Sequence, residues 1–438
     1  MATQRFNSIR WSRRNVLKAT GATGLAVGLG GGIRASRAGG ATGKRVVVVG
    51  GGPGGATTAK YLRKFDPSVE VTLVEKDPVY HTCFGANWYL GGFREFERTR
   101  QGFDALQKEH GVKIVQDTVT RWDSDKGEAR LAENGKLSFD RLVISPGIDF
   151  RWEDVSGMGP EDTEQVPHAW AGGKQYRILR RQLEAMDDGG TVAICPPTNP
   201  FRCPPGPYER ASLVAHYLKE NKPRSKVLVL DAKDGFSKQG LFEEGWAELY
   251  GDMIEWVPGS EGGVIHRVDP GNRVVATREG FEEHDVDVLN VIPPQRAGKI
   301  ARDMGLTDET GWCPVDQRTF ESSVQPGVHV IGDASIAGAM PKSAFAANNQ
   351  GKMTAAAIVS ELRGQKVPEP SLVNTCYSLV GPDYGISVAA VYHFEDGKIR
   401  GVEGAGGVSP SGAGDFFRMR EARYSRGWFA GVTDDIWG

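Results

Sequence analysis

The feature that most restricts the fold of this chain is a glycine-rich turn that follows its first apolar run. The run 44–49 leads directly into Gly50-Gly51-Gly52-Pro53-Gly54-Gly55, and the segment 56–65 continues with apolar residues at helical spacing. A second apolar run, 70–74, ends in Glu75, twenty residues beyond the last glycine. This order of strand, glycine motif, helix, strand and acid predicts a dinucleotide-binding unit.

Each glycine of the G-x-G-x-x-G pattern has its own physical reason. Gly50 permits the tight turn, Gly52 lets the backbone approach a pyrophosphate, and Gly55 lets the helix pack against the strand. Glu75 is expected to accept hydrogen bonds from the ribose hydroxyls. A glycine-rich surface turn is the alternative for the motif taken alone.

A second set of motifs, far along the chain, favours FAD over NAD as the bound dinucleotide. The strand-like run 327–331 leads into Gly332-Asp333, and in flavoproteins with two dinucleotide-binding domains an aspartate placed in this way bonds the ribityl chain. The helix that follows is expected to direct its N-terminus at the flavin. Lys342, just before that helix, is a candidate for offsetting negative charge on the reduced flavin, and a surface lysine is the alternative.

The expected second nucleotide site lacks its glycine turn. After the strand-like run 191–195 the sequence instead has Pro200–Glu209, PFRCPPGPYE, and then a helical pattern over 208–218. Proline cannot supply the backbone N–H groups that hold a pyrophosphate. We therefore expect a rigid loop that presents the Cys203 thiol where a flavin enzyme of ordinary type would bind NADH. Glu209 is a candidate for proton handling, with a first-turn acid that satisfies the helix dipole as the equal alternative.

These motifs predict an α/β fold with two Rossmann-like dinucleotide-binding domains of the two-dinucleotide flavoprotein type and a C-terminal α+β interface domain. The expected domains are a removed signal at 1–38, an FAD-binding domain at 39–155 and 297–368, a second Rossmann-like domain without an NAD site at 156–296, and a C-terminal domain at 369–438.

The first 38 residues are predicted to be a twin-arginine signal that directs export to the periplasm. Arg13 and Arg14 precede a weakly apolar, glycine-rich stretch, and Ser36-Arg37-Ala38 supplies small residues for cleavage. A disordered basic terminus is the alternative. The whole chain has a net charge of −2, and residues 1–38 carry seven basic and no acidic residues, so the remainder is acidic. An acidic surface argues against a nucleic-acid partner and fits a basic or dipolar protein.

The chain contains five cysteines: Cys83, Cys195, Cys203, Cys313 and Cys376. They form no C-x-x-C or C-x-x-C-H pattern, so neither a metal site nor haem attachment is predicted, and any haem must belong to a partner. The residues alone favour a buried thiol for Cys83 and assign no role to Cys195 or Cys313. The isolated His168, Trp170 and His216 are assigned to structure.

Several long and unusual runs resemble the flavoprotein subunit of flavocytochrome c sulfide dehydrogenase. The runs that carry the resemblance are Gly50–Gly55, Tyr80–Cys83, Phe201–Glu209, Ile292–Gly298, Gly311–Asp316, Ile331–Ile336 and Asn374–Tyr377. The resemblance implies that Cys83 is joined by a thioether to the flavin 8α-methyl group. It also implies that Cys203 and Cys376 form a disulfide over the isoalloxazine ring, for which a structural staple is the alternative reading.

The resemblance implies that hydrosulfide is oxidised to zero-valent sulfur or polysulfide, with electrons passing to a c-type cytochrome subunit. The nearest alternative is a sulfide:quinone oxidoreductase, for which aromatic residues after 415 would form a membrane-facing surface. We do not expect membrane contact. A second alternative is a flavoprotein that binds and reactivates a periplasmic sulfur-oxidation complex. An NADH-dependent disulfide reductase is disfavoured by the missing second glycine motif.

Overall fold

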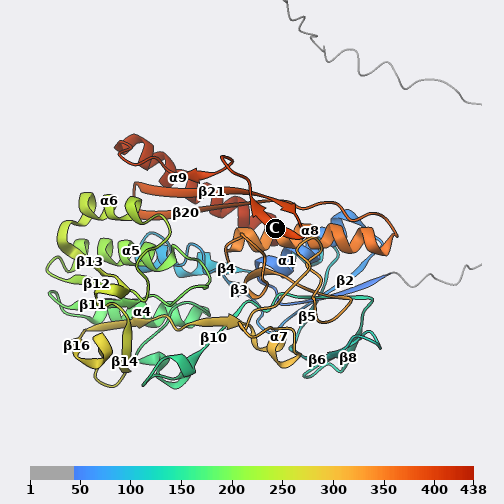
Figure 1. Ribbon diagram of the computed structural model, residues 1–438, viewed down its shortest axis with the longest axis horizontal. Coiled ribbons are helices and arrows are strands. Elements are labelled where there is room, and N and C mark those ends of the chain that lie inside the picture. Colours follow the sequence, from blue (N-terminus) through green and yellow to red (C-terminus); the bar gives the residue numbers. More distant parts are fainter. Residues whose placement is uncertain (1–43) are drawn as a thin grey trace, which may run out of the picture. The chain divides into compact units, whose positions relative to one another are not determined.

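The computed structural model describes residues 44–438, and the predicted signal at 1–38 lies outside the described residues. A five-stranded parallel sheet in the order β19-β9-β1-β2-β5 forms the first α/β unit (Figure 1). Its strands are β1 (Arg45–Val49), β2 (Glu70–Glu75), β5 (Lys113–Gln116), β9 (Arg141–Ile144) and β19 (Val328–Val330). These strands are short apolar runs because helices and loops cover the sheet and leave its centre buried.

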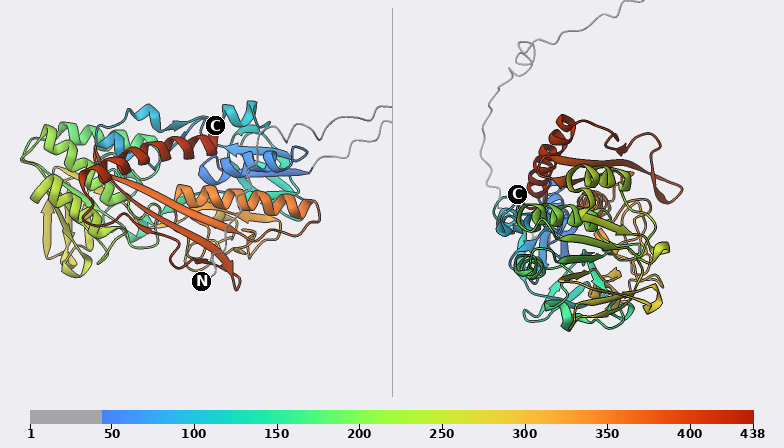
Figure 2. Two further views of the ribbon diagram at one scale, coloured as in Figure 1. Left: turned by 90° about the horizontal axis from the view of Figure 1, so that it is seen from above. Right: turned by 90° about the vertical axis from the view of Figure 1, so that its left-hand side faces the viewer.

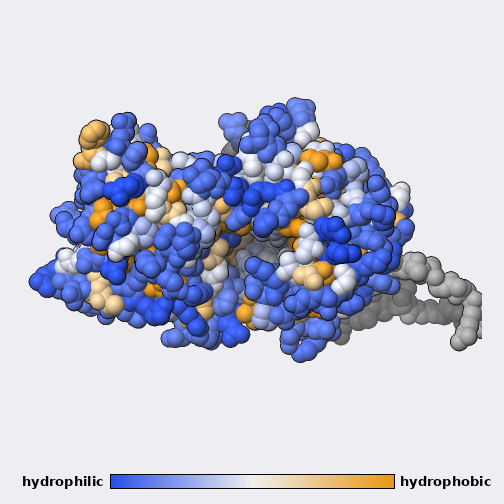
Figure 3. Space-filling view, turned by 90° about the horizontal axis from the view of Figure 1, so that it is seen from below, coloured by the Kyte–Doolittle hydropathy of each residue, from blue (hydrophilic) through white to orange (hydrophobic). Residues whose placement is uncertain are grey.

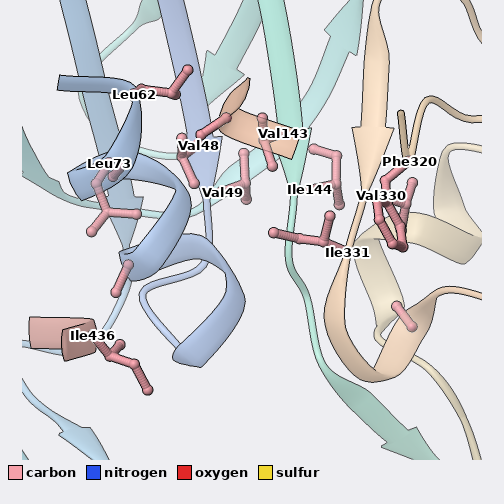
Figure 4. Close-up of a cluster of buried hydrophobic side chains, with 14 of the residues drawn as sticks. Val48, Val49, Leu62, Leu73, Val143, Ile144, Phe320, Val330, Ile331 and Ile436 are labelled. Atoms are coloured by element: carbon pink, nitrogen blue, oxygen red, sulfur yellow. The ribbon is translucent and has the colours of Figure 1, made fainter. Parts of the chain in front are cut away.

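Branched aliphatic side chains from neighbouring strands form the core of this unit. Val48 on β1, Val143 on β9 and Val330 on β19 are fully buried, and Figure 4 shows them side by side with the neighbouring Ile144 and Ile331. Because β19 comes from a distant part of the sequence, the first unit closes only when residues near 330 return to it.

Helices α1 (Pro53–Phe65) and α8 (Ala344–Leu362) pack closely against each other. A Cβ on Gly351 of α8 would lie 2.7 Å from the Gly54 carbonyl oxygen of α1, so small residues permit the approach. An antiparallel sheet replaces a helix in the connection between β5 and β9. Its strands are β6 (Val119–Asp123), β7 (Glu128–Leu131) and β8 (Lys136–Ser138).

The second α/β unit contains a four-stranded parallel sheet in the order β13-β12-β11-β17. Its strands are β11 (Thr191–Cys195), β12 (Lys226–Leu230), β13 (Ile254–Val257) and β17 (Val288–Val291). The helices of this unit are α4 (Gly173–Ala185), α5 (Gly206–Asn221) and α6 (Gln239–Tyr250). An antiparallel sheet extends it with β14 (Ile265–Asp269), β15 (Val274–Thr277) and β16 (Glu282–Asp285). The two units are joined by the pair β10 (Ile148–Phe150) and β18 (Gln295–Ala297).

A long antiparallel hairpin and a helix form the last layer, which contacts both units (Figures 1 and 2). Strand β20 packs on α5 and α6 of the second unit and on α8 of the first. The elements of this layer are β20 (Ser371–Gly381), β21 (Tyr384–Glu395), β22 (Lys398–Gly401), β23 (Gly407–Val408) and α9 (Asp415–Trp437). The remaining short elements are β3 (Tyr80–His81), β4 (Arg100–Gln101), α2 (Asn87–Leu90), α3 (Asp104–Lys108) and α7 (Lys299–Asp303).

The C-terminal part of α9 is held against the first unit. Trp437 is buried and its Nε1 donates to the Gly51 carbonyl oxygen at 3.0 Å. The Asp435 carboxylate accepts from Tyr61 Oη of α1 at 2.6 Å and pairs with Lys352 Nζ of α8 at 2.6 Å. Helix α9 therefore closes over the glycine-rich turn.

The aromatic residues proposed for a membrane-facing surface do not lie together. Phe416 and Tyr424, in the first half of α9, are exposed, whereas Phe429 and Trp437 are buried in the core. That part of the interfacial interpretation is wrong, because Phe429 packs on Phe84 and Trp88. Trp437 packs on Tyr80 and Phe84. None of the helices within residues 44–438 is long and apolar enough to cross a membrane. The face shown in Figure 3 is mostly hydrophilic, with apolar residues in separate patches.

Candidate active site

The glycine-rich turn opens a cleft at the carboxyl ends of the strands of the first sheet. Gly50 has φ +98°, and a Cβ there would lie 2.3 Å from the Ser145 carbonyl oxygen. A Cβ on Gly55 would lie 1.9 Å from the Gly50 carbonyl oxygen, so neither position accepts a side chain. Gly50 and Gly52, directly before α1, and Gly54, in its first turn, line the cleft, which is where a pyrophosphate binds in such units.

Glu75 lies at the end of β2 and lines the same cleft. Its Oε2 accepts from the Gly51 backbone N–H at 2.7 Å, and its Oε1 accepts from the Asp77 N–H at 3.1 Å. These two bonds orient the carboxylate beside the glycine turn. The oxygen atoms keep lone pairs for further donors, so the arrangement fits the predicted role toward ribose hydroxyls.

Asp333 is the clearest structural sign that the cleft fits a polar ligand. It follows Gly332, which has φ +74° and whose backbone N–H donates to Gln350 Oε1 of α8 at 2.7 Å. The Asp333 Oδ1 atom is buried and has no hydrogen-bond partner among residues 44–438. Burial raises the pKa of this carboxyl, and the cations Arg202 and Lys342 oppose that rise. A hydroxyl donor from a ligand in the cleft would satisfy Asp333, and the ribityl chain of FAD carries such donors.

Cys83 lies in the turn after β3 and lines the cleft beside Tyr80. Burial raises the pKa of its thiol, and the positive charge of Arg202 lowers it. The thiol is free, as are those of the other four cysteines. Its place in the cleft fits the predicted contact with the flavin, and the thioether remains a prediction.

The loop before α5 presents Cys203 as the sequence suggests. Cys203 has φ +59°, its backbone N–H donates to the Lys342 carbonyl oxygen at 2.8 Å, and its carbonyl accepts from the Gly206 N–H at 2.8 Å. A left-handed conformation costs a non-glycine residue about 1–2 kcal/mol. A Cβ on Gly206 would lie 3.0 Å from Cys203 Sγ and 2.6 Å from the Trp170 ring, so a glycine is required beside this thiol.

Cys376 comes from β20, 173 positions further along the chain, and meets the same site. Strand β20 packs on α5, which starts directly after the Cys203 loop. Burial raises the pKa of the Cys203 thiol well above its ordinary value, and negative charge on Cys376, Cys83 and Glu209 raises it further. The structure thus brings the three predicted cysteines into one electrostatic cluster.

Glu209 is buried in the first turn of α5 and its carboxylate joins three elements. Oε1 accepts from Trp88 Nε1 at 3.1 Å and from the Leu379 backbone N–H at 3.0 Å, and Oε2 accepts from Asn87 Nδ2 at 3.0 Å. Both carboxylate oxygens therefore have neutral donors from α2 and β20. The interpretation of Glu209 as an acid that only satisfies the helix dipole is incomplete, because these hydrogen bonds also connect α5 to α2 and β20. The carboxylate also raises the pKa of both Cys203 and Cys376.

Lys342 is held inside the turn that follows β19. Its Nζ donates to the Asp333 carbonyl oxygen at 2.6 Å and to the Ser335 carbonyl oxygen at 3.1 Å, and it lies 3.6 Å from the centre of the Trp312 ring. Burial lowers the pKa of this lysine to about 8. These contacts exclude the interpretation of Lys342 as a solvated surface lysine and place its charge beside the backbone of Asp333.

Three residues of the site were not among the predicted ones. Arg202 lines the cleft with Cys83 and Asp333, and its Nε is buried without a partner. Trp170, which the sequence assigned to structure, packs against Gly206 beside Cys203. Lys238 is buried near Cys376 and donates from Nζ to Ser378 Oγ at 2.8 Å. Only Arg202 had a sequence signal, since it adjoins Cys203.

The position that holds a ribose acid in a second nucleotide site is closed by side chains. Asp231 follows β12, and its Oδ2 accepts from Tyr208 Oη at 2.5 Å and from Trp256 Nε1 at 3.1 Å. Lys233 Nζ donates to its other oxygen at 2.6 Å. The Tyr208 ring stacks on Phe236 with ring centres 3.6 Å apart. Because the carboxylate is fully engaged, this unit offers no free acid to a nicotinamide nucleotide.

The fold and the cleft define a flavoprotein with two dinucleotide-binding units, and the absence of a nucleotide site in the second unit stays a prediction. Three regions of two known families match parts of the chain. They are the pyridine nucleotide-disulphide oxidoreductases over 44–181, the central region of the sulfide dehydrogenase [flavocytochrome c] flavoprotein chain over 176–293, and the flavin-binding region of flavocytochrome c sulphide dehydrogenase over 368–437.

Individual relatives agree with these matches. The sulfide dehydrogenase [flavocytochrome c] flavoprotein chain of Chlorobaculum thiosulfatiphilum is 72% identical over 40 residues, which cover 83% of that sequence and 9% of this chain. This chain therefore belongs to the family of flavocytochrome c sulfide dehydrogenase flavoprotein chains. Mitochondrial sulfide:quinone oxidoreductase of Mus musculus is 24% identical over 309 residues, which span 66% of this chain and 65% of the mouse protein.

Solved structures share the fold. The sulfide:quinone oxidoreductase of Aquifex aeolicus superposes with a TM-score of 0.66 at 17% identity, covering 90% of this chain and 92% of that one. An NAD-dependent persulfide reductase of A. fulgidus gives a TM-score of 0.61 at 16% identity, covering 87% and 77%. At such identities the similarity establishes the two-dinucleotide flavoprotein architecture, and the reaction has to be inferred from the residues of the site.

Proposed function

We propose that this protein oxidises hydrosulfide through a Cys203–Cys376 disulfide and FAD and passes the electrons to a c-type cytochrome subunit. The observation that carries the proposal is the proximity of Cys203 and Cys376 to Cys83, which lines the dinucleotide cleft. A disulfide there is an electrophile for HS⁻ and lies next to a two-electron acceptor. The engaged Asp231 carboxylate of the second unit supports the predicted absence of an NAD site in that unit.

The sulfur chemistry balances without a further reagent. HS⁻ attacks one sulfur of the disulfide, the S–S bond breaks, and a persulfide forms on one cysteine while the other becomes a thiolate. Bound FAD supplies the acceptor for the electron pair. A second HS⁻ then removes the zero-valent sulfur as a polysulfide and leaves two cysteine thiolates, which give up that electron pair as the disulfide forms again. Overall, one HS⁻ yields zero-valent sulfur, a proton and two electrons, which leave singly to the haem of the partner.

The residues of this chain divide the remaining work. Gly50, Gly52 and Glu75 would hold the pyrophosphate and ribose of FAD, and Asp333 would accept from the ribityl chain. Cys83 would fix the flavin covalently, which prevents its loss where no free FAD is available. The Glu209 carboxylate, in electrostatic contact with both cysteines, would handle protons at the dithiol.

The cellular context is part of the same proposal. We infer export to the periplasm by the twin-arginine route, which carries folded protein and so suits a chain that acquires its cofactor before export. The acidic remainder of the chain supports a basic or dipolar cytochrome partner.

An anaerobic titration of the purified holoprotein tests the function. Flavin absorbance is followed while sulfide, NADH, oxidised cytochrome c and a water-soluble quinone are added in separate arms. Bleaching by sulfide and recovery with cytochrome c support the proposal. Recovery only with the quinone would favour a sulfide:quinone oxidoreductase, and bleaching only by NADH would overturn both. No response to sulfide, together with capture of a sulfur-carrier protein, would favour the reactivating role.

A further inference from the structure

Lys238 is a buried cation that the mechanism has not used. It lies directly before α6, is 8% exposed, and has φ +63°, a left-handed conformation that is costly for a residue with a side chain. Within residues 44–438 no carboxylate lies within ion-pair distance of its ammonium group. The ammonium group donates to the Ser378 hydroxyl at 2.8 Å and lies 5.7 Å from the centre of the Phe242 ring. A buried charge without an ion pair is expensive, so its retention calls for an explanation.

The position of Lys238 relates it to one cysteine of the pair. Ser378 and Cys376 are two residues apart on β20, and side chains two apart lie on the same face of a strand. The hydrogen bond to Ser378 therefore holds the ammonium group on the face that carries Cys376. Tyr377, between them, points to the opposite face and packs on Trp428 of α9.

The charges around the two sulfur atoms are unequal. Burial raises the pKa of the Cys376 thiol, and Lys238 is the strongest charge that acts on it and lowers it, against Glu209 and Cys83. For Cys203 the negative groups Cys376, Cys83 and Glu209 act more strongly than its cation, Arg202. Lys238 in turn faces Cys376, Glu209, Cys203 and, from α9, Glu421. A thiolate is therefore better stabilised on Cys376 than on Cys203.

We propose that Lys238 is the positioning residue that makes Cys376 the leaving thiolate, so that hydrosulfide attacks Cys203 and the persulfide forms there. The inference rests on the proposed sulfide chemistry. HS⁻ forms a bond to Cys203 Sγ, the Cys203–Cys376 bond breaks, and its electron pair stays on Cys376 beside the Lys238 ammonium group. In thiol–disulfide exchange the sulfur with the lower pKa leaves faster, which fixes this direction.

The first experiment locates the added sulfur in the wild-type holoprotein. One equivalent of sulfide is added anaerobically, the thiols are alkylated at once, and peptides are analysed by mass spectrometry. We expect the extra sulfur on the peptide of Cys203 and simple alkylation of Cys376. Extra sulfur on Cys376 overturns the inference, even if sulfide reduces the flavin as the proposed function requires.

A second arm separates failure of the inference from failure of the proposed function. If sulfide does not open the disulfide, 2-mercaptoethanol is used as the attacking thiol and the mixed disulfide is located in the same way. A mixed disulfide on Cys203 with free Cys376 supports the directing role of Lys238 although the substrate is wrong. A mixed disulfide on Cys376 refutes it.

Variants test the charge itself. Lys238→Met is expected to slow disulfide opening by about three- to tenfold and to move the pH dependence of Cys376 alkylation upward, because a cation near the leaving sulfur is lost. Lys238→Arg should restore both. Ser378→Ala keeps the charge and should change opening less than Lys238→Met does, and Lys219→Met, on the exposed end of α5, is the matched lysine control. Equal opening rates and alkylation profiles in Lys238→Met and wild type contradict the role. If Lys238→Met does not fold, the wild-type sulfur location decides.

Discussion

Replacing Glu209 by glutamine tests how its buried carboxylate acts on the dithiol. The carboxylate accepts three hydrogen bonds of 3.0–3.1 Å from Trp88, Asn87 and the Leu379 backbone. A glutamine carbonyl can keep the two bonds at Oε1, but its amide nitrogen then faces Asn87 Nδ2, donor against donor. Asn87 cannot simply turn over, because its Nδ2 also donates to Gly206 and its Oδ1 accepts from Arg210.

One buried polar group is therefore left unsatisfied, and the cost to the free energy of unfolding is about 1–3 kcal/mol. The same substitution also changes the acidity of the two cysteines. The Glu209 charge raises the pKa of Cys203 and Cys376, so removing it lowers both pKa values and increases the thiolate fraction at neutral pH. If the carboxylate also relays protons, turnover with sulfide falls by about a hundredfold or more although thiolates form more readily.

Three measurements on the holoprotein separate these effects: denaturant unfolding, alkylation rates of the reduced protein against pH, and turnover with sulfide. Glu220→Gln makes the same chemical change on an exposed residue of α5 and should alter none of them. An alkylation profile that moves to higher pH in Glu209→Gln would refute the electrostatic reasoning. Unchanged turnover would remove Glu209 from proton handling and leave it an electrostatic role.

Further changes address the cofactor and the packing. Cys83→Ser should leave flavin bound but allow its release from the denatured protein, whereas wild-type flavin should stay on the peptide; release from denatured wild type argues against the thioether. Asp333→Ala, made in the Cys83→Ser background so that no thioether holds the flavin, should weaken flavin retention relative to Cys83→Ser alone, measured as flavin content after gel filtration, because the ribityl acceptor is lost; equal retention contradicts its assignment. Trp437→Ala should lower the free energy of unfolding by about 3–5 kcal/mol, since it removes a buried ring and its bond to Gly51; a loss below about 1 kcal/mol would count against the docking of α9. Burial lowers the pKa of Lys342 from 10.5 to about 8, so between these pH values the folded protein binds fewer protons than the unfolded chain. The free energy of unfolding of the wild type should therefore rise with pH in this range relative to Lys342→Met. Parallel curves of unfolding free energy against pH would show that the ammonium group is solvated.

Local pattern predicted the elements that carry the cofactor cleft. Strands β1 and β2 agree with the predicted runs to within one residue. Helix α1 begins at Pro53, three residues before the predicted start, because proline fits the first turn of a helix and the glycines adopt helical geometry without strain. The loop of Cys203 was evident because proline excludes a phosphate-binding turn. These signals are short-range, so one segment of sequence contains them.

Contacts between distant segments were beyond the same reasoning. Trp88 and Asn87 reach Glu209 across more than 120 positions, and Lys238 reaches Ser378 across 140. An isolated lysine or tryptophan shows no local sequence pattern that identifies its contacts, so the sequence did not indicate a role at the site for Lys238 or Trp170. The two faces of α9 were also indistinguishable in sequence, because aromatic residues occur on both; only the packing of Phe429 on Phe84 and Trp88 separates it from the exposed Phe416.

The bond between Trp437 and Gly51 joins positions 386 residues apart and has a consequence for the timing of assembly. At a synthesis rate of about 5–20 residues per second, roughly 20–80 s separate the emergence of the two partners from the ribosome. During that interval the glycine turn exists without the helix that closes over it. FAD thus has a window in which to enter an uncovered cleft, and the arrival of α9 then slows its escape. We expect flavin added after α9 has docked to be incorporated more slowly than flavin present throughout translation.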